Sequence, residues 1–231
     1  MRRFLRLLIR FLINIIADVK ISGYEYLPEG SFVIASNHLG FLDVLLLFYA
    51  IDRPDMFIPV AEKWEKVALF RWLRKPLNLV FIDRFNPDIK ALRKILQLME
   101  AGNILVIAPE GTRSRTETMA EGRPGVAYLA ARLERPIVPV GLYGTEDRKV
   151  LDNLKHFRRS KIVVRAGPAF HLPPLPARDR DQALRAYTDE IMCRIAALLP
   201  EKYRGVYRDH PRLQELLRQG SEMQKQASMA D

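Results

Sequence analysis

The sequence contains very little cysteine and histidine. A single cysteine, Cys193, occurs among 231 residues, so no framework of internal disulfide bonds can hold the chain together. The four histidines lie far apart, and their spacing matches no zinc site. We therefore expect a chain from a reducing compartment whose chemistry uses no metal. Cys193 falls in a predicted helix, where a small buried side chain is expected, and we assign it no role.

The N-terminal segment lacks an uncharged run long enough to cross a bilayer. Its longest such run, residues 11–17, would extend about 10 Å as a helix, whereas the hydrocarbon layer is about 30 Å thick. No small-residue cleavage site follows, which argues against a secretory signal peptide. Arg2, Arg6 and Arg10 instead recur every four residues between leucine, isoleucine and phenylalanine, a pattern that predicts an amphipathic helix over residues 1–18.

We expect this amphipathic helix to lie on a membrane. Its arginines would meet anionic headgroups while its apolar side chains enter the lipid, which predicts a peripheral, monotopic protein on the cytoplasmic face. The alternative is a surface helix that packs on the protein core.

The charge balance is strongly positive. The net charge is +10 at pH 7 and arginine is more frequent than lysine, so we expect an anionic partner. Both a membrane surface and nucleic acid would qualify. The sequence shows no recognition helix, zinc finger or aromatic sheet motif, so we expect no nucleic-acid partner.

Alternation of short apolar runs with helical segments predicts an α/β fold with a largely parallel central sheet covered by helices. The predicted strands are residues 20–24, 31–35, 56–61, 78–82, 103–108, 136–143 and 161–166. The predicted helices are residues 42–51, 64–73, 87–101, 124–133, 151–157 and 181–199. One domain would occupy residues 19–208. Residues 209–231 would form a C-terminal helix with a disordered tail from Arg218.

Polar side chains follow the predicted strands. In a parallel sheet the carboxyl ends of the strands share one edge, where ligands bind. His38 and Asp43 follow the strand at residues 31–35. The later strands are followed by Glu62 and Lys63, by Asp83 and Arg84, by residues 109–114 and by residues 144–146. We therefore expect one edge of the sheet to collect a histidine, carboxylates, a lysine and arginines.

His38 and Asp43 are the first candidates for chemistry. On a straight helix, side chains five residues apart point about 140° away from each other, so the two could not touch. Gly40 supplies a bend that would bring them together. A carboxylate bound to an imidazole fixes its tautomer and leaves one nitrogen to take a proton from a hydroxyl. The alternative is that His38 caps a helix or fills a polar gap, and that Asp43 sits in the first turn of a helix, where the helix dipole favours a negative charge.

The segment at residues 109–114 is the second candidate. It pairs Glu110 with Arg113 across Gly111, which lets the backbone approach a ligand closely. Together with Arg84, Arg113 would offer two guanidinium groups to one phosphate monoester. The alternative is a loop with a local salt bridge and a Thr/Ser helix cap.

Four segments, in this order, resemble the glycerolipid acyltransferase family, the bacterial 1-acylglycerol-3-phosphate acyltransferases and their relatives. They are Asn37-His38 with Asp43, Val80-Phe81-Ile82-Asp83-Arg84, Pro109-Glu110-Gly111-Thr112-Arg113-Ser114, and Pro136-Ile137-Val138-Pro139-Val140. The resemblance covers about Phe32 to Val140 and implies a glycerol-3-phosphate acyltransferase-like α/β fold.

The resemblance also implies a role for each matching residue. His38 would be the general base, and Asp43 would orient it. Pro139 would shape the site near the acyl donor, and Lys63 would polarise the carbonyl of the thioester. The acceptor phosphate and headgroup would be bound by Arg84, Glu110, Gly111, Thr112 and Arg113.

The implied reaction moves a fatty acyl group from a thioester to the sn-2 hydroxyl of lysophosphatidate, giving phosphatidate in phospholipid synthesis. A thioester is already activated, so no cofactor is expected beyond the co-substrate, acyl-coenzyme A or acyl-acyl-carrier protein. Ala108 and Arg123 depart from the family pattern and leave the acceptor open. Glycerol 3-phosphate, another lysophospholipid or an amino-acid lyso-lipid are alternatives, and a non-catalytic lipid-binding protein is an alternative from another class.

Overall fold

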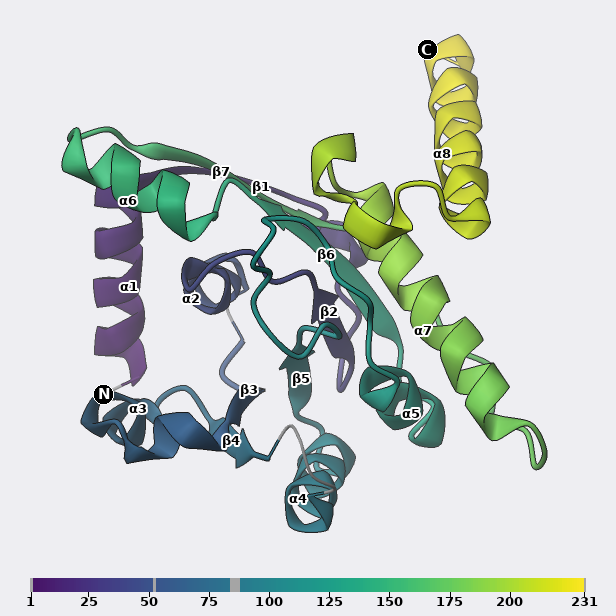
Figure 1. The fold of residues 1–231 in the computed structure, drawn as a ribbon, viewed down its shortest axis with the longest axis horizontal. Coiled ribbons are helices and arrows are strands. Elements are labelled where there is room, and N and C mark those ends of the chain that lie inside the picture. Colours follow the sequence, from purple (N-terminus) through teal and green to yellow (C-terminus); the bar gives the residue numbers. More distant parts are fainter. Residues whose placement is uncertain (1, 52, 84–87, 231) are drawn as a thin grey trace.

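The computed structural model describes residues 2–51, 53–83 and 88–230 (Figure 1). At its centre is a seven-stranded sheet with the strand order β1-β7-β6-β2-β5-β3-β4. The strands are β1 (Ala17–Ser22), β2 (Val33–Ser36), β3 (Met56–Ala61), β4 (Leu79–Ile82), β5 (Ile104–Ile107), β6 (Ile137–Tyr143) and β7 (Ser160–Ala166). Strands β2 to β6 run parallel, while β7 is antiparallel to β6 and parallel to β1. The predicted α/β fold with a mostly parallel sheet is confirmed.

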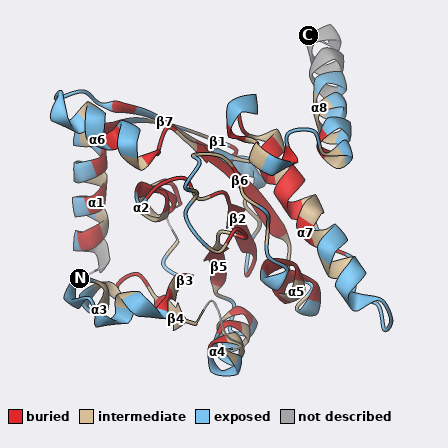
Figure 2. Cartoon of the chain, viewed as in Figure 1, coloured by how far each residue is buried: buried red, intermediate tan, exposed pale blue. Residues whose placement is uncertain are grey.

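Helices cover both faces of the sheet (Figure 1). The covering helices are α1 (Arg2–Ile16) and α2 (Leu42–Ala50) on one face, and α4 (Ile89–Glu100), α5 (Gly125–Arg132) and α7 (Arg180–Ala197) on the other. Strand β2 contributes side chains to the hydrophobic cores on both faces of the sheet, because alternate side chains of a strand point to opposite faces. Val33 and Ala35 pack with α4, α5 and α7, whereas Ile34 packs with α1 and α2. Figure 2 shows the central strands buried between these helices.

Strand direction brings the predicted connections to one edge. Strand β2 pairs with β5 on one side and with β6 on the other, both in parallel. The connection that carries His38 therefore lies between the one that carries Glu110 and the one that carries Thr145. Arg84, predicted at the same edge after β4, lies outside the described residues.

Helix α1 has three distinct faces. Leu5, Ile9 and Ile13 are buried in the core, so the helix packs on the protein as the alternative interpretation expected. Arg6 and Arg10 are half-buried beside this face. The remaining face exposes large apolar side chains, namely Phe4, Leu7, Leu8, Phe11, Leu12 and Ile15. Within the described ranges, no helix is both long and apolar enough to span a bilayer.

The helix predicted over residues 64–73 is divided in two. A 3-10 helix, η2 (Glu62–Lys66), is followed by helix α3 (Ala68–Leu73). The break occurs at Val67, whose backbone is extended. Trp64 and Phe70 stack across the break with ring centroids 4.8 Å apart, so packing between aromatic rings folds the segment back on itself.

The C-terminal segment differs from the prediction of a disordered tail from Arg218. It belongs to a single helix, α8 (Pro211–Ala230), which follows α7 and two 3-10 turns, η3 (Glu201–Tyr203) and η4 (Gly205–Tyr207). Leu213 is fully buried, and Leu216 and Leu217 pack on the same core. The core thus fixes the first turns of α8, after which each added residue contributes one backbone hydrogen bond.

Candidate active site

The loop at residues 37–43 links β2 to α2 and brings the two predicted catalytic side chains together. His38 Nδ1 lies 2.8 Å from Asp43 Oδ2. Because the carboxylate oxygen accepts, we assign the hydrogen to Nδ1, which leaves Nε2 as an acceptor. The His38 side chain is 22% exposed, so a substrate hydroxyl can reach it. The predicted contact is present, and the catalytic roles of the two residues stay predictions.

The backbone of the loop fixes the Asp43 carboxylate. Besides the imidazole, Oδ2 accepts hydrogen bonds from the backbone N–H of Leu39 at 2.7 Å and of Gly40 at 2.9 Å. Oδ1 is buried and has no hydrogen-bond partner in the described part of the chain. Three donors on one oxygen hold the carboxylate in place, and the carboxylate in turn orients the imidazole.

Gly40 lies at a bend in the loop, as predicted, and glycine is also needed there for space. It is not among the glycines with a left-handed backbone. A β-carbon at this position would lie 1.9 Å from the carbonyl oxygen of Thr145, far inside van der Waals contact. Glycine therefore lets the loop lie directly against the turn that follows β6.

Asn37 anchors the start of the loop, a role that sequence reasoning missed. Its amide donates to the carbonyl of Leu142 and accepts from the N–H of Leu142, each at 2.8 Å. The side chain is almost completely buried. The sequence signal was a polar amide at the end of an apolar strand, because such a group must find partners inside the fold.

Glu110 lies beneath the loop rather than in an open site. Its Oε1 accepts from the backbone N–H of His38 at 3.0 Å, and its Oε2 accepts from the N–H of Ala120 at 2.9 Å. Burial raises the pKa of Glu110 to about 7, although both N–H donors favour the charged form. The structure thus places Glu110 against the backbone of His38, and the predicted headgroup contact remains a prediction.

A hollow of about 400 Å³ opens beside the loop. It is lined by Gly111, Thr112, Arg113, Ser114, Arg115, Thr116, Ala120 and Arg123. The backbone N–H of Ser114 donates to the carbonyl of His38 at 2.8 Å, so the wall of the hollow is joined to the loop that carries His38. Among the described residues, three arginines and no carboxylate line the hollow, which suits an anion with several oxygens, such as phosphate.

Gly111 allows two parts of this wall to meet. Its backbone is left-handed, with φ of 71°, a conformation that favours glycine. A β-carbon there would lie 3.1 Å from Cδ of Arg123. Arg123, which departs from the family pattern, therefore lies close against the loop that carries Arg113.

Asp147 is the second residue that sequence reasoning missed. It begins helix α6 (Asp147–Lys155), which follows β6. Its Oδ2 accepts from Arg113 Nη1 at 2.7 Å, and its Oδ1 accepts from the backbone N–H of Phe41 at 2.8 Å. Its position directly after residues 144–146, which were predicted at this edge, was the available signal. The partners lie 34 and 106 residues away in the sequence, so no local pattern reveals the contacts.

Lys63 and Pro139 lie outside this group of contacts. Lys63 is exposed in η2, with its ammonium 5.5 Å from the centroid of the Trp64 ring. Pro139 is buried within β6, in register with Ala35 of β2. The roles assigned to both residues, and to Arg84, stay predictions.

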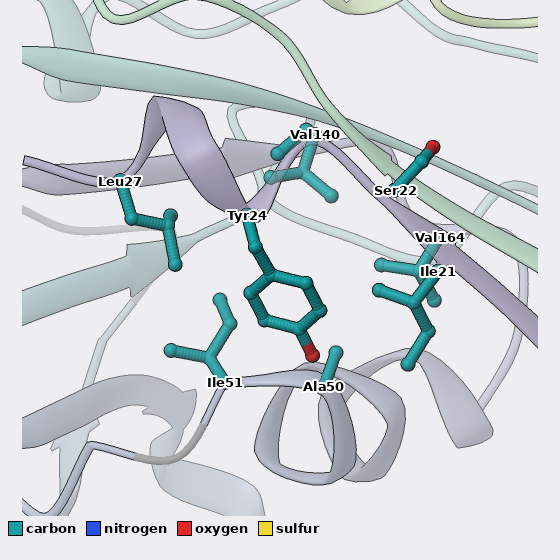
Figure 3. Close-up of a pocket in the computed structure, with 9 residues that line it drawn as sticks. Ile21, Ser22, Tyr24, Leu27, Ala50, Ile51, Val140 and Val164 are labelled. Carbon is teal, nitrogen blue, oxygen red and sulfur yellow. The ribbon is translucent and has the colours of Figure 1, made fainter.

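A second cavity, of about 10 Å³, lies beneath Tyr24 (Figure 3). Its lining is mostly apolar and includes Ile21, Leu27, Ala50 and Ile51. A space of this size holds about one water molecule, and the apolar walls offer few partners, so we interpret it as a packing gap. Across the described residues, no cluster of histidine, cysteine, aspartate or glutamate is arranged to bind a metal ion.

The acyltransferase family model matches residues 18–143, more than half of the chain. The chain belongs to the acyltransferase family. Its resemblance to that family, predicted from four short segments, is confirmed. The loop that carries His38 and the described wall of the hollow from Gly111 to Thr116 both lie within the matched region.

Two relatives of this acyltransferase are called 1-acyl-sn-glycerol-3-phosphate acyltransferase. The protein from Bacillus subtilis (strain 168) is 27% identical over 195 residues, which cover 82% of this chain and 92% of the relative. The protein from Cocos nucifera is 27% identical over 190 residues, which cover 79% of this chain and 58% of the relative.

A solved structure has the same fold. It is the crystal structure of the 1-acyl-sn-glycerophosphate (LPA) acyltransferase PlsC from Thermotoga maritima, which matches with a TM-score of 0.62 and 22% sequence identity. The match covers 82% of this chain and 77% of that chain. This likeness supports the α/β architecture described above.

Proposed function

We propose that this acyltransferase moves a fatty acyl group from a thioester to the free sn-2 hydroxyl of 1-acylglycerol 3-phosphate, giving phosphatidate. One observation carries the proposal: the His38–Asp43 pair adjoins an arginine-lined hollow, and the hydrogen bond from Ser114 to His38 joins the two. An acceptor that bears both a hydroxyl and a phosphate fits this arrangement. The names of the Bacillus and coconut relatives support the same acceptor.

His38 acts as the general base. The acceptor hydroxyl oxygen attacks the carbonyl carbon of the thioester while its proton passes to His38 Nε2. The carbon–sulfur bond then breaks, the new ester remains, and the thiolate leaves and takes up a proton. Asp43 holds the imidazole in place and stabilises the imidazolium that forms. The pantetheine thioesters of coenzyme A and acyl carrier protein both supply this chemistry.

The arginine-lined hollow binds the phosphate of the acceptor. Arg113 binds the acceptor phosphate, with Arg84 as the second predicted ligand, and the exposed Thr112 lies in the same wall. Fixing the phosphate sets which hydroxyl of the acceptor reaches His38. Glu110 supports this arrangement from below by holding the backbone of His38.

The enzyme attaches to the cytoplasmic face of a membrane through helix α1. Phe4, Leu7, Phe11 and Ile15 are each at least half exposed, and their spacing aligns them on one face of the helix. Arg6 and Arg10 occupy a different face, between the apolar side and the buried side. The net charge of +10 adds attraction to anionic lipids. The lipid acceptor and the product stay at the bilayer surface.

The substrate assignment is tested with purified protein in liposomes and a palmitoyl thioester of either carrier. We expect phosphatidate from 1-acylglycerol 3-phosphate. With 1-acylglycerol, which lacks the phosphate, we expect kcat/KM to fall by at least about 100-fold, since hydrogen bonds to charged groups contribute about 1.5–3 kcal/mol each. Failure to form phosphatidate with either thioester would reject the acceptor. Equal rates on both acceptors would reject phosphate recognition.

Membrane attachment is tested by replacing Phe4 and Phe11 with aspartate. Each phenylalanine contributes about 1.5–3 kcal/mol when it is buried in an apolar phase, so binding to anionic vesicles should weaken by at least about tenfold per residue. The control is Val206→Asp, which changes a side chain of similar exposure on η4 (65%, against 68% and 62%). Equal vesicle binding by the α1 variant and the control would reject this attachment.

A further inference from the structure

The turn after β6 contacts both halves of the candidate site. Its Asp147 carboxylate accepts one hydrogen bond from Arg113, in the wall of the hollow, and another from the backbone of Phe41, in the catalytic loop. The loop lies against the same turn, because a β-carbon at Gly40 would lie 1.9 Å from Thr145 O and 3.0 Å from Asp147 Oδ1. Asp147 is therefore a direct link between the phosphate-binding wall and the loop that holds His38.

The turn is a firm support for this link. Thr145 and Glu146 are buried, with exposed fractions of 0% and 5%. The hydroxyl of Tyr203 donates to Glu146 Oε1 at 2.6 Å. Gly144 has a left-handed backbone, and a β-carbon there would lie 2.1 Å from the carbonyl oxygen of Lys161 in β7. Contacts on several sides thus fix the backbone from which Asp147 projects.

The ion pair between Arg113 and Asp147 is better explained by positioning than by stability. Its side chains are 43% and 35% exposed, and exposed ion pairs add little to stability. The guanidinium group has five N–H donors in a rigid plane, and the contact with Asp147 is made through Nη1. Holding one edge of the group at Asp147 orients the remaining donors for a phosphate in the hollow.

We propose that Asp147 is a positioning residue that orients Arg113 toward the acceptor phosphate and holds Phe41, so that the phosphate and the His38 loop keep a fixed separation. The inference rests on the proposed function. Phosphate recognition and hydroxyl activation then share one carboxylate, with one oxygen serving each. Removing the charge should affect mainly acceptor binding, whereas removing both oxygens should affect the chemical step as well.

Two variants separate the two contacts. In Asp147→Asn the amide oxygen can still accept from Phe41, but the pairing with Arg113 is lost. We expect KM for 1-acylglycerol 3-phosphate to rise about fivefold to tenfold, with kcat within about twofold of wild type. In Asp147→Ala both contacts are lost, and we expect kcat to fall about tenfold in addition. The control is Asp152→Asn, an exposed aspartate on the same helix, which should behave as wild type.

Combination with Arg113→Gln tests whether Asp147 acts through Arg113. In that background we expect Asp147→Asn to raise KM no further. An additional rise in the double variant would overturn the proposal, as would an unchanged KM in Asp147→Asn alone. A lower KM in that variant would also overturn it, because the carboxylate would then compete with the phosphate.

Equilibrium binding of 1-acylglycerol 3-phosphate without donor thioester gives a readout that does not depend on acyl transfer. We expect Asp147→Asn to weaken this binding by the same fivefold to tenfold. If wild type binds 1-acylglycerol 3-phosphate but does not acylate it, the proposed reaction is rejected. The role of Asp147 in binding the acceptor is then still supported by weaker binding in Asp147→Asn. Equal binding by wild type and variant, or no binding by wild type, would overturn the role of Asp147.

Discussion

The loop that carries His38 and the arginine-lined hollow are neighbours, yet they are constructed in opposite ways. In the loop, Asn37 and Asp43 are buried, and backbone groups hold both side chains. In the hollow, Thr112, Arg113 and Arg115 are exposed. Buried, fully directed hydrogen bonds suit a proton transfer that depends on geometry. Exposed arginines on a loop suit recognition of a ligand, because they can be substituted without disturbing the buried groups around His38.

The largest effect is expected at the centre of the buried region. His38→Ala removes the proposed general base and should lower kcat about 1,000-fold, with little change in KM, because such a base contributes about 10² to 10⁴ in rate. The control is His156→Ala, an exposed histidine after α6. The measurement is the steady-state rate of phosphatidate formation by wild type, His38→Ala and His156→Ala. Similar kcat values in wild type and His38→Ala would show that His38 is not the general base.

The pH dependence of stability tests whether the Glu110 carboxyl group beneath the loop is buried away from water. Its folded pKa of about 7 lies above its ordinary value of 4.5, so the folded protein binds this proton more tightly than the unfolded chain. The resulting stabilisation is complete below pH 4.5 and is lost as the pH rises through 7. It amounts to about 3 kcal/mol. Wild type should therefore lose about that much more unfolding free energy than Glu110→Gln between pH 4.5 and 8.

Denaturant unfolding at several pH values measures this difference for Glu110. The matched control is Glu100→Gln, which changes an exposed glutamate at the end of α4 and should follow wild type. The same pH dependence in wild type and Glu110→Gln would contradict a buried, poorly solvated carboxylate beneath His38.

A smaller effect is expected where the loop meets the turn after β6. Gly40→Ala places a methyl group against Thr145 O, so one of the two segments must move. We expect a loss of about 2 kcal/mol in stability, together with a lower kcat. Gly125→Ala is the control, because a β-carbon there would meet no described atom within 4 Å beyond its chain neighbours and its own helix backbone. Thermal unfolding that is equally unaffected by both changes would show that the close contact does not constrain the loop.

Much of the fold and part of the site could be predicted from the sequence. The strand at Met56–Ala61 was predicted at its observed bounds, because apolar periodicity and flanking turns are local signals. His38 and Asp43 could also be found from a local signal, since only four residues separate them. The predicted parallel direction of the strands placed Glu110 and Thr145 at the same edge of the sheet before any contact was known.

The remaining features depend on contacts between distant segments. The motif identified Glu110, but only the fold shows that its oxygens face the backbone of His38. The periodicity of α1 indicated an amphipathic helix, yet it could not show that one apolar face packs on the core while Phe4 and Phe11 remain outside. Asp147 meets Phe41 across 106 residues, a separation at which sequence spacing carries no information.

The most direct test of the division between chemistry and recognition compares His38→Ala with Arg113→Gln at increasing concentrations of 1-acylglycerol 3-phosphate. If the loop performs the chemistry and the hollow binds the phosphate, Arg113→Gln will approach the wild-type rate at saturation, with KM raised at least about tenfold. His38→Ala will stay about 1,000-fold slow at every concentration. Recovery of His38→Ala at saturation, or a rate for Arg113→Gln that stays equally low, would contradict this account.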